Sequence, residues 1–320
     1  MKSHPAAARL REVLFEQEDA AQRLALCRMT TGAAVVRTVW HLPPGNFLAE
    51  YADMLNKADT EAGKRRRKAL DPVVYEGLRV VAAASTAAWA LGSDHPAVKI
   101  AANGSFALLQ RYVVAFHEDL WSYNSHLNVF LGALSLTRPV DDSAPASSAD
   151  RSTSALLAAL QAYYACMYLQ SGMSKFVGAG WKWTEGSALH GAWGELGTRL
   201  GKYFAAERPE LPPVLSKATV AYELAFAPLL LLAWHRRSLL GLSSAAFHGA
   251  VKVTLDISFW HLSWFSAPLF VVPTSVARPV AEAMWTSRKS KLLGGVITAA
   301  GAVAAAAPLL KSLRKNRSRG

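Results

Sequence analysis

Residues 152–174, STSALLAALQAYYACMYLQSGMS, carry no charged side chain. A helix needs roughly 20 mostly apolar residues to cross the ~30 Å hydrocarbon core of a membrane. Two further stretches without Asp, Glu, Lys or Arg, residues 257–277 and 292–310, have a similar length. A helix of a soluble protein needs a polar face toward water, so several such stretches indicate transmembrane α-helices rather than a large soluble helical core.

The overall composition is less extreme than these stretches. The 320 residues are 52% hydrophobic and 18% charged, and the mean hydropathy is +0.14. The net charge of +12 comes largely from two clusters, KRRRK at residues 64–68 and the tail at residues 311–319. Beside long apolar runs, such clusters favour anchoring to anionic lipid over binding of nucleic acid. We therefore expect membrane lipids as a partner, and no nucleic acid.

The hydropathy pattern predicts an all-α, polytopic transmembrane bundle in the cell membrane, with seven to nine spans. The predicted spans are residues 21–40, 73–91, 98–116, 120–137, 153–176, 214–234 and 292–310, with one long kinked span or two short ones in residues 239–273. Residues 41–71 are predicted to form a polar loop. Residues 181–213 combine several Trp side chains with many charges, which predicts one amphipathic helix at the membrane interface.

The same pattern divides the chain into three regions. Residues 1–20 form an N-terminal polar segment without the apolar core of a signal peptide. Residues 21–276 form the transmembrane domain, and residues 277–320 form a basic segment with a final Ala-rich span. No Cys/His spacing typical of a metal site occurs in the sequence, so no metal is expected.

Several ionisable residues fall inside the predicted spans. They are Arg28, His126, Lys175, Glu223, His248, Lys252, Asp256 and His261. A charged side chain at mid-bilayer costs about 2.5–3.5 kcal/mol on insertion scales, so such residues usually face a bundle interior or a cavity. Lys252 and Asp256 are four residues apart, a spacing that predicts a structural ion pair on one helix face.

His126 and Lys175 are the most informative of these residues. His126 lies near the start of the fourth predicted span and Lys175 near the end of the fifth. Consecutive spans run antiparallel, so we expect both side chains near the same membrane face. A lysine shielded from water can act as a base, and a histidine can relay a proton. On spacing alone, the simpler interpretation is that Lys175 marks the end of a span and His126 is a satisfied interior hydrogen-bonding group.

The segment QSGMSKF at residues 170–176, followed by Trp181, Trp183 and Gly186, resembles a motif of the vitamin K-dependent γ-glutamyl carboxylase and its bacterial relatives, the horizontally transferred transmembrane (HTTM) domain family. In that family a Gly-x-x-Lys-apolar motif closes a span, and Trp-x-x-Gly follows. The lysine is the base that deprotonates vitamin K hydroquinone in the carboxylase. The resemblance therefore implies that role for Lys175.

Further motifs extend the resemblance over residues 20–275. Asn124-Ser125-His126 is similar to the Asn-Asn-His of the carboxylase, whose histidine is functionally important. The order Glu223, Pro228, basic turn and His248 is also similar to that of family members, as is Arg28 followed by Gly32. The resemblance implies Lys175 and His126 as catalytic residues, with cavity candidates Arg28, Asn124, Glu223 and His248. It also implies a reduced quinone of the vitamin K type as the cofactor.

The resemblance implies a carboxylase- or epoxidase-like membrane enzyme that modifies a peptide or uses a quinone-type lipid. Carboxylation itself is not implied, because the large lumenal domain of the eukaryotic carboxylase has no counterpart in these 320 residues. In length the chain is similar to the sporulation-delaying-protein-B type. That similarity implies an alternative, a non-catalytic maturation or export factor for a secreted peptide toxin, with a small accessory protein. A transporter is the third alternative, although internal repeats typical of transporters are not apparent.

Overall fold

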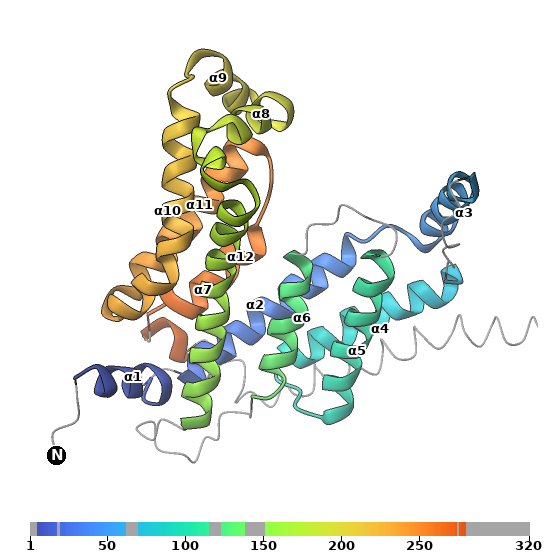
Figure 1. Cartoon of the computed structure of the whole chain (residues 1–320). Coiled ribbons are helices and arrows are strands. Elements are labelled where there is room, and N and C mark those ends of the chain that lie inside the picture. The colour runs from blue at the N-terminus through green and yellow to red at the C-terminus, as the bar shows by residue number, and fades with distance from the viewer. Residues whose placement is uncertain are drawn as a thin grey trace, which may run out of the picture. The chain divides into compact units, whose positions relative to one another are not determined.

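The structure, a computed structural model, describes residues 5–17, 20–61, 70–114, 123–137, 151–273 and 275–279. Every regular element in these ranges is a helix (Figure 1), which confirms the predicted all-α class. The chain divides into two compact units, one of Met1–Leu24 with Pro145–Ala277 (unit 1) and one of Ala25–Ala144 with Arg278–Gly320 (unit 2). The boundary falls within helix α2, Ala20–Trp40.

Unit 1 is built around three long helices, α7 (Arg151–Ala179), α10 (Leu211–Leu232) and α11 (Arg237–Leu255). Its other elements are α1 (Pro5–Phe15), η1 (Gly180–Glu185), α8 (Ser187–Leu196), α9 (Arg199–Glu207), η2 (Trp234–Arg236), α12 (Trp260–Ser266) and the π-helical turn η3 (Ala267–Val271). Helix α7 packs against α10, and α11 packs against α12 and η3. In Figure 1, α8 and α9 lie at one end of these long helices and α1 at the other.

Unit 2 contains the rest of α2 together with α3 (Gly45–Glu61), α4 (Pro72–Ala90), α5 (Pro96–Val114) and α6 (Tyr123–Leu134). Helix α4 begins with a side-chain cap, because Asp71 accepts a hydrogen bond from the backbone N–H of Val73 at 2.8 Å and Pro72 suits the first helical position. Helices α4 and α5 form an antiparallel pair joined by a short turn. Gly92 in that turn has φ +104°, the left-handed region that favours glycine.

Three details differ from the predicted layout. Residues 41–71 contain the helix α3 instead of being loop throughout, and Leu48 and Ala52, one turn apart, are both fully buried. Helix α6 (Tyr123–Leu134) ends before the predicted end of the span at residues 120–137, and residues 120–122 lie outside the described part. The predicted interfacial helix is divided into η1, α8 and α9, because Gly197 ends α8 and the Thr198 hydroxyl caps α9.

Helix α10 is long and apolar enough to cross a membrane, judged by length and composition, and it alone meets that standard within the described ranges. The count of seven to nine spans therefore stays a prediction. Residues 239–273 form the two helices α11 and α12, and the predicted Lys252–Asp256 pair is present and exposed. The final Ala-rich span, the basic clusters at 64–68 and 311–319 and the loop at 138–150 lie outside the described residues.

Candidate functional site

One face of α7 carries a line of polar side chains. Its members recur at alternating spacings of three and four residues, at Gln161, Tyr164, Tyr168, Ser171 and Lys175. Helical residues at these spacings share one face, and the five positions extend over about 21 Å at 1.5 Å per residue. We call this line the α7 polar stripe. Its hydrogen-bond partners lie on α10, on α11 and in neighbouring segments of unit 1.

Lys175 ends the α7 polar stripe beside Glu223 of α10. Its Nζ lies 2.7 Å from each carboxylate oxygen of Glu223 and 2.7 Å from Oγ of Ser171. Ser171 also donates a hydrogen bond to Glu223 at 3.0 Å. The Glu223 side chain is 5% exposed and the Lys175 side chain 22%. Because an ammonium group has three donors, these three acceptors can engage all of them.

Gly172 explains how Glu223 comes so close to α7. A methyl group on its Cα would lie 3.0 Å from the Leu224 side chain and 3.1 Å from Cβ of Glu223. The missing side chain lets α10 approach α7 at the level of Glu223, and Lys175 lies three residues further along the same helix. The Gly-x-x-Lys spacing therefore has a direct geometric consequence in this chain.

Replacing Gly172 with valine is expected to separate α7 from α10 and weaken the Lys175–Glu223 contact. Overpacking of this kind typically costs about 1–3 kcal/mol, so the thermal unfolding midpoint of the detergent-solubilised protein should fall. Gly178→Val is the matched control on the same helix, because no atom lies within 4 Å of a Cβ there. Equal losses in both variants would contradict the proposed role of Gly172.

Trp183 of η1 lies over the amine of Lys175. The distance from Lys175 Nζ to the ring centroid is 5.3 Å, within the range of a cation–π contact. The turn after η1 is pressed onto the start of α10, since Gly186 has φ +87° and a Cβ there would lie 2.4 Å from the nitrogen of Pro213. Trp183 is thus held next to the helix that carries Glu223.

The middle of the α7 polar stripe forms a buried chain of hydroxyl groups. The Tyr164 hydroxyl donates to the backbone carbonyl of Leu262 at 3.0 Å and lies 2.5 Å from Oγ of Ser244. Ser244 lies 2.6 Å from the Tyr168 hydroxyl, which is 2.8 Å from Nε2 of His248. All four polar side chains are buried. The chain connects α7 with α11 through side-chain hydrogen bonds alone.

The other end of the α7 polar stripe is tied to the N-terminal part of unit 1. Gln161 accepts a hydrogen bond from Nε2 of Gln17 at 2.9 Å and donates to the carbonyl of Leu269 at 2.9 Å. Both glutamines are buried. Every member of the stripe therefore has a hydrogen-bond partner, as burial of polar groups requires.

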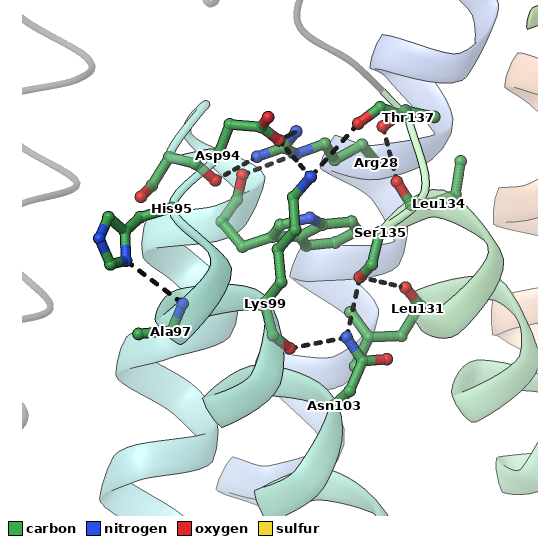
Figure 2. Close-up of polar contacts among 12 residues, drawn as sticks. Arg28, Asp94, His95, Ala97, Lys99, Asn103, Leu131, Leu134, Ser135 and Thr137 are labelled. Atoms are coloured by element: carbon green, nitrogen blue, oxygen red, sulfur yellow. Dashed lines mark hydrogen bonds and ion pairs between the residues drawn. The ribbon is translucent and has the colours of Figure 1, made fainter.

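Unit 2 contains a separate polar cluster around Arg28 (Figure 2). The fully buried Arg28 guanidinium donates to the carbonyls of Trp89 at 2.7 Å and Ser93 at 2.6 Å. Its Nη1 lies 3.7 Å from Oδ1 of Asp94, which also pairs with Lys99 at 2.5 Å. The same guanidinium lies over the Trp89 ring at 4.8 Å from the centroid. These contacts hold the α4–α5 turn against α2 and indicate a structural role for Arg28.

The structure distributes the predicted site residues between the two units. Lys175, Glu223 and His248 belong to unit 1, and Lys175 contacts Glu223 directly. Asn124 and the half-buried His126 lie in the first turn of α6 in unit 2, and the Asn124 side chain is outside the described part. The expected approach of His126 to Lys175 joins two units, so it stays a prediction.

Tyr164, Tyr168 and Ser244 are not among the residues predicted from the sequence. The prediction depends on charged groups inside predicted spans, whereas these residues are neutral hydrogen-bonding groups. A signal was present, because the polar side chains of residues 161–175 recur at spacings of three and four. Helical periodicity among hydroxyl and amide residues therefore indicates the α7 part of the site.

No protein-family model, curated protein or solved structure matches the chain.

Proposed function

We propose that the chain is a polytopic protein of the cell membrane. The support is its distribution of polarity, in which many large apolar side chains are exposed and several polar or charged groups are buried beside an apolar core. The exposed apolar residues include Ile100, Leu108, Leu231, Leu232, Leu239 and Val253, and the buried polar residues include Arg28, Gln161, Glu223, Ser244 and His248. A water-exposed protein rarely buries charged groups or exposes extended apolar surface, whereas polar groups of a membrane bundle face its interior.

Six described helices have a suitable length for crossing: α2, α4, α5, α7, α10 and α11, of 19 to 29 residues. At 1.5 Å per residue, 19 residues extend about 28 Å, close to the ~30 Å hydrocarbon thickness. Helix α6, α12 with η3, and residues 292–310 are the remaining candidates within the proposed seven to nine spans. Trp181, Leu196 and Tyr203 are exposed around η1, α8 and α9, which suits the headgroup zone.

The expressed protein should remain with the membrane fraction after washing at alkaline pH and should need detergent for extraction. The reason is the apolar outer surface, which has favourable contacts in lipid and none in water. Immunodetection of the tagged full chain in pellet and supernatant measures the outcome. Release by the alkaline wash would exclude transmembrane insertion.

We propose further that unit 1 carries a proton-transfer site in an enzyme of the HTTM type, and that Lys175 and Glu223 form its acid–base pair. The carrying observation is the contact of the Lys175 amine with both oxygens of a carboxylate that is only 5% exposed. When one proton passes from Lys175 Nζ to Glu223, the products are a neutral amine and a neutral carboxylic acid. The amine then holds a lone pair that can take up a proton.

The residues fit a hydroxyl-bearing lipid such as a reduced quinone. The Lys175 side chain is 22% exposed, and the Trp183 ring beside its amine offers an apolar face. When bound, such a lipid would supply a weakly acidic hydroxyl group. Ser171 keeps the amine oriented through its 2.7 Å contact, and Glu223 holds the transferred proton.

One observation favours the second candidate, a non-catalytic maturation factor for a secreted peptide. The three contacts of the Lys175 amine satisfy its donors without any ligand, as a purely structural ion pair would. The two candidates predict different outcomes when the carboxylate loses its ability to take up a proton.

Glu223→Gln is expected to lower quinol turnover or peptide maturation at least tenfold. The amide retains the volume and can still accept a hydrogen bond from Lys175, but it cannot receive the proton that frees the amine. The assay compares membranes containing equal amounts of each variant. Glu207→Gln, at an exposed position on α9, is the matched control and should leave the activity unchanged. Full activity of Glu223→Gln would favour the structural interpretation of the pair.

A further inference from the structure

When every contact in the chain from Tyr164 to His248 is a hydrogen bond, the chain has one consistent direction. A backbone carbonyl can only accept, so the Tyr164 proton must point to the Leu262 oxygen, 3.0 Å away. Tyr164 then accepts from Ser244, and Ser244 accepts from Tyr168. With its own proton committed to Ser244, the Tyr168 oxygen can only accept from His248, so Nε2 of His248 carries a hydrogen.

This direction fixes the tautomer of His248. A neutral imidazole with a hydrogen on Nε2 has a lone pair on Nδ1. Nδ1 is buried and has no hydrogen-bond partner among the described residues, and His248 as a whole residue is only 7% exposed. Protonation at Nδ1 would instead bury an unpaired charged donor, which is strongly unfavourable. His248 therefore presents a single acceptor of fixed orientation.

The surroundings of His248 indicate which kind of ligand could donate a hydrogen bond to its Nδ1. The centroid of its ring lies 5.4 Å from that of Phe247, 5.3 Å from that of Phe259 and 5.7 Å from that of Tyr168. A buried acceptor without a donor costs free energy, and a chain of aligned hydrogen bonds strengthens the acceptor at its end. A complementary ligand has one hydrogen-bond donor on an aromatic or otherwise apolar body.

We infer that Nδ1 of His248 is a binding group for the hydroxyl of a phenol- or quinol-class ligand, held in the acceptor form by the Tyr168–Ser244–Tyr164 chain. The inference shares its ligand class with the proposed function, but it uses neither Lys175 nor Glu223. Failure of one does not imply failure of the other. In this assignment His248 contacts the ligand, and the three hydroxyl residues position His248.

The test uses the full chain in detergent with its histidine rings labelled with ¹⁵N, and 1,4-dihydroxybenzene as the probe. The NMR signals of His248 are assigned by their loss in His248→Gln. We expect a protonated Nε2 and a bare Nδ1, and a shift of the Nδ1 signal on addition of the probe. The dimethyl ether, 1,4-dimethoxybenzene, has no donor and should cause no such shift. A protonated Nδ1 in the unliganded protein, or equal responses to both compounds, would overturn the inference.

Variants distinguish the binding of the probe by His248 from the positioning of His248 by the hydroxyl chain. A phenylalanine at position 248 keeps an aromatic ring but has no hydrogen-bond acceptor, so probe affinity should fall about tenfold or more. Tyr168→Phe or Ser244→Ala breaks the chain and should give a mixture of His248 tautomers. Ser174→Ala is the control, because its exposed hydroxyl donates to the backbone carbonyl of Gln170 at 2.7 Å, outside the chain. Retained probe affinity in a folded His248→Phe variant, or an unchanged tautomer in both chain variants, would contradict the assignment.

Discussion

Lys175→Arg is expected to lower activity by about 10²–10⁴-fold, the range that a positioned general base contributes. Arginine keeps a positive charge beside Glu223, so an ion pair can persist. Its guanidinium, however, does not lose a proton under these conditions, and it cannot become the neutral base that the proposed mechanism needs. The measurement is quinol turnover or peptide maturation, with the variant protein quantified in the same membranes.

Two companion variants make the result interpretable. Lys175→Ala should be as inactive as Lys175→Arg, and it should also be less stable because Glu223 would lose its cation while 5% exposed. Lys182→Arg, in η1, exchanges the same residue types seven positions away and should be neutral. If Lys175→Arg kept full activity, Lys175 would serve as a structural cation, and the enzyme proposal would lose its central residue.

Arg28→Ala is expected to give the largest loss of stability, about 3–5 kcal/mol, the usual cost of removing one member of a buried charged network. The change would leave the carbonyls of Trp89 and Ser93 without their donor and would open a cavity against Trp89. The folded fraction of the full chain after heating in detergent, followed by size-exclusion chromatography, measures the effect.

The side-chain geometry predicts a graded series at this position. Arg28→Lys should be intermediate, because a lysine keeps the charge but cannot reach two carbonyls with the planar fork of a guanidinium. Arg111→Ala, at an exposed position on α5, is the control and should change stability by less than about 0.5 kcal/mol. Equal stability of Arg28→Ala and Arg111→Ala would show that the cluster in Figure 2 contributes little to unit 2.

Several features of the fold could be predicted because they depend on local sequence. The positions of α2, α4, α5, α7 and α10 follow from apolar runs of suitable length between turn residues, and the structure places those helices within a few residues of the predicted ranges. The break between α11 and α12 was one of two predicted alternatives. Helix α3 was missed because its apolar positions, such as Leu48 and Ala52, are few and lie among charges.

The sequence by itself determined the all-α class and the approximate positions of most of the long helices, and it identified Lys175 as a candidate site residue, since these depend on hydropathy and on motif spacing within one segment. Tertiary structure decided that Glu223 is the immediate partner of Lys175, because a separation of 48 positions in the sequence does not specify which faces of α7 and α10 meet. It also decided the direction of the chain that ends at His248. That direction depends on the Leu262 carbonyl, a backbone group that every residue possesses and whose position only the packing of the helices determines.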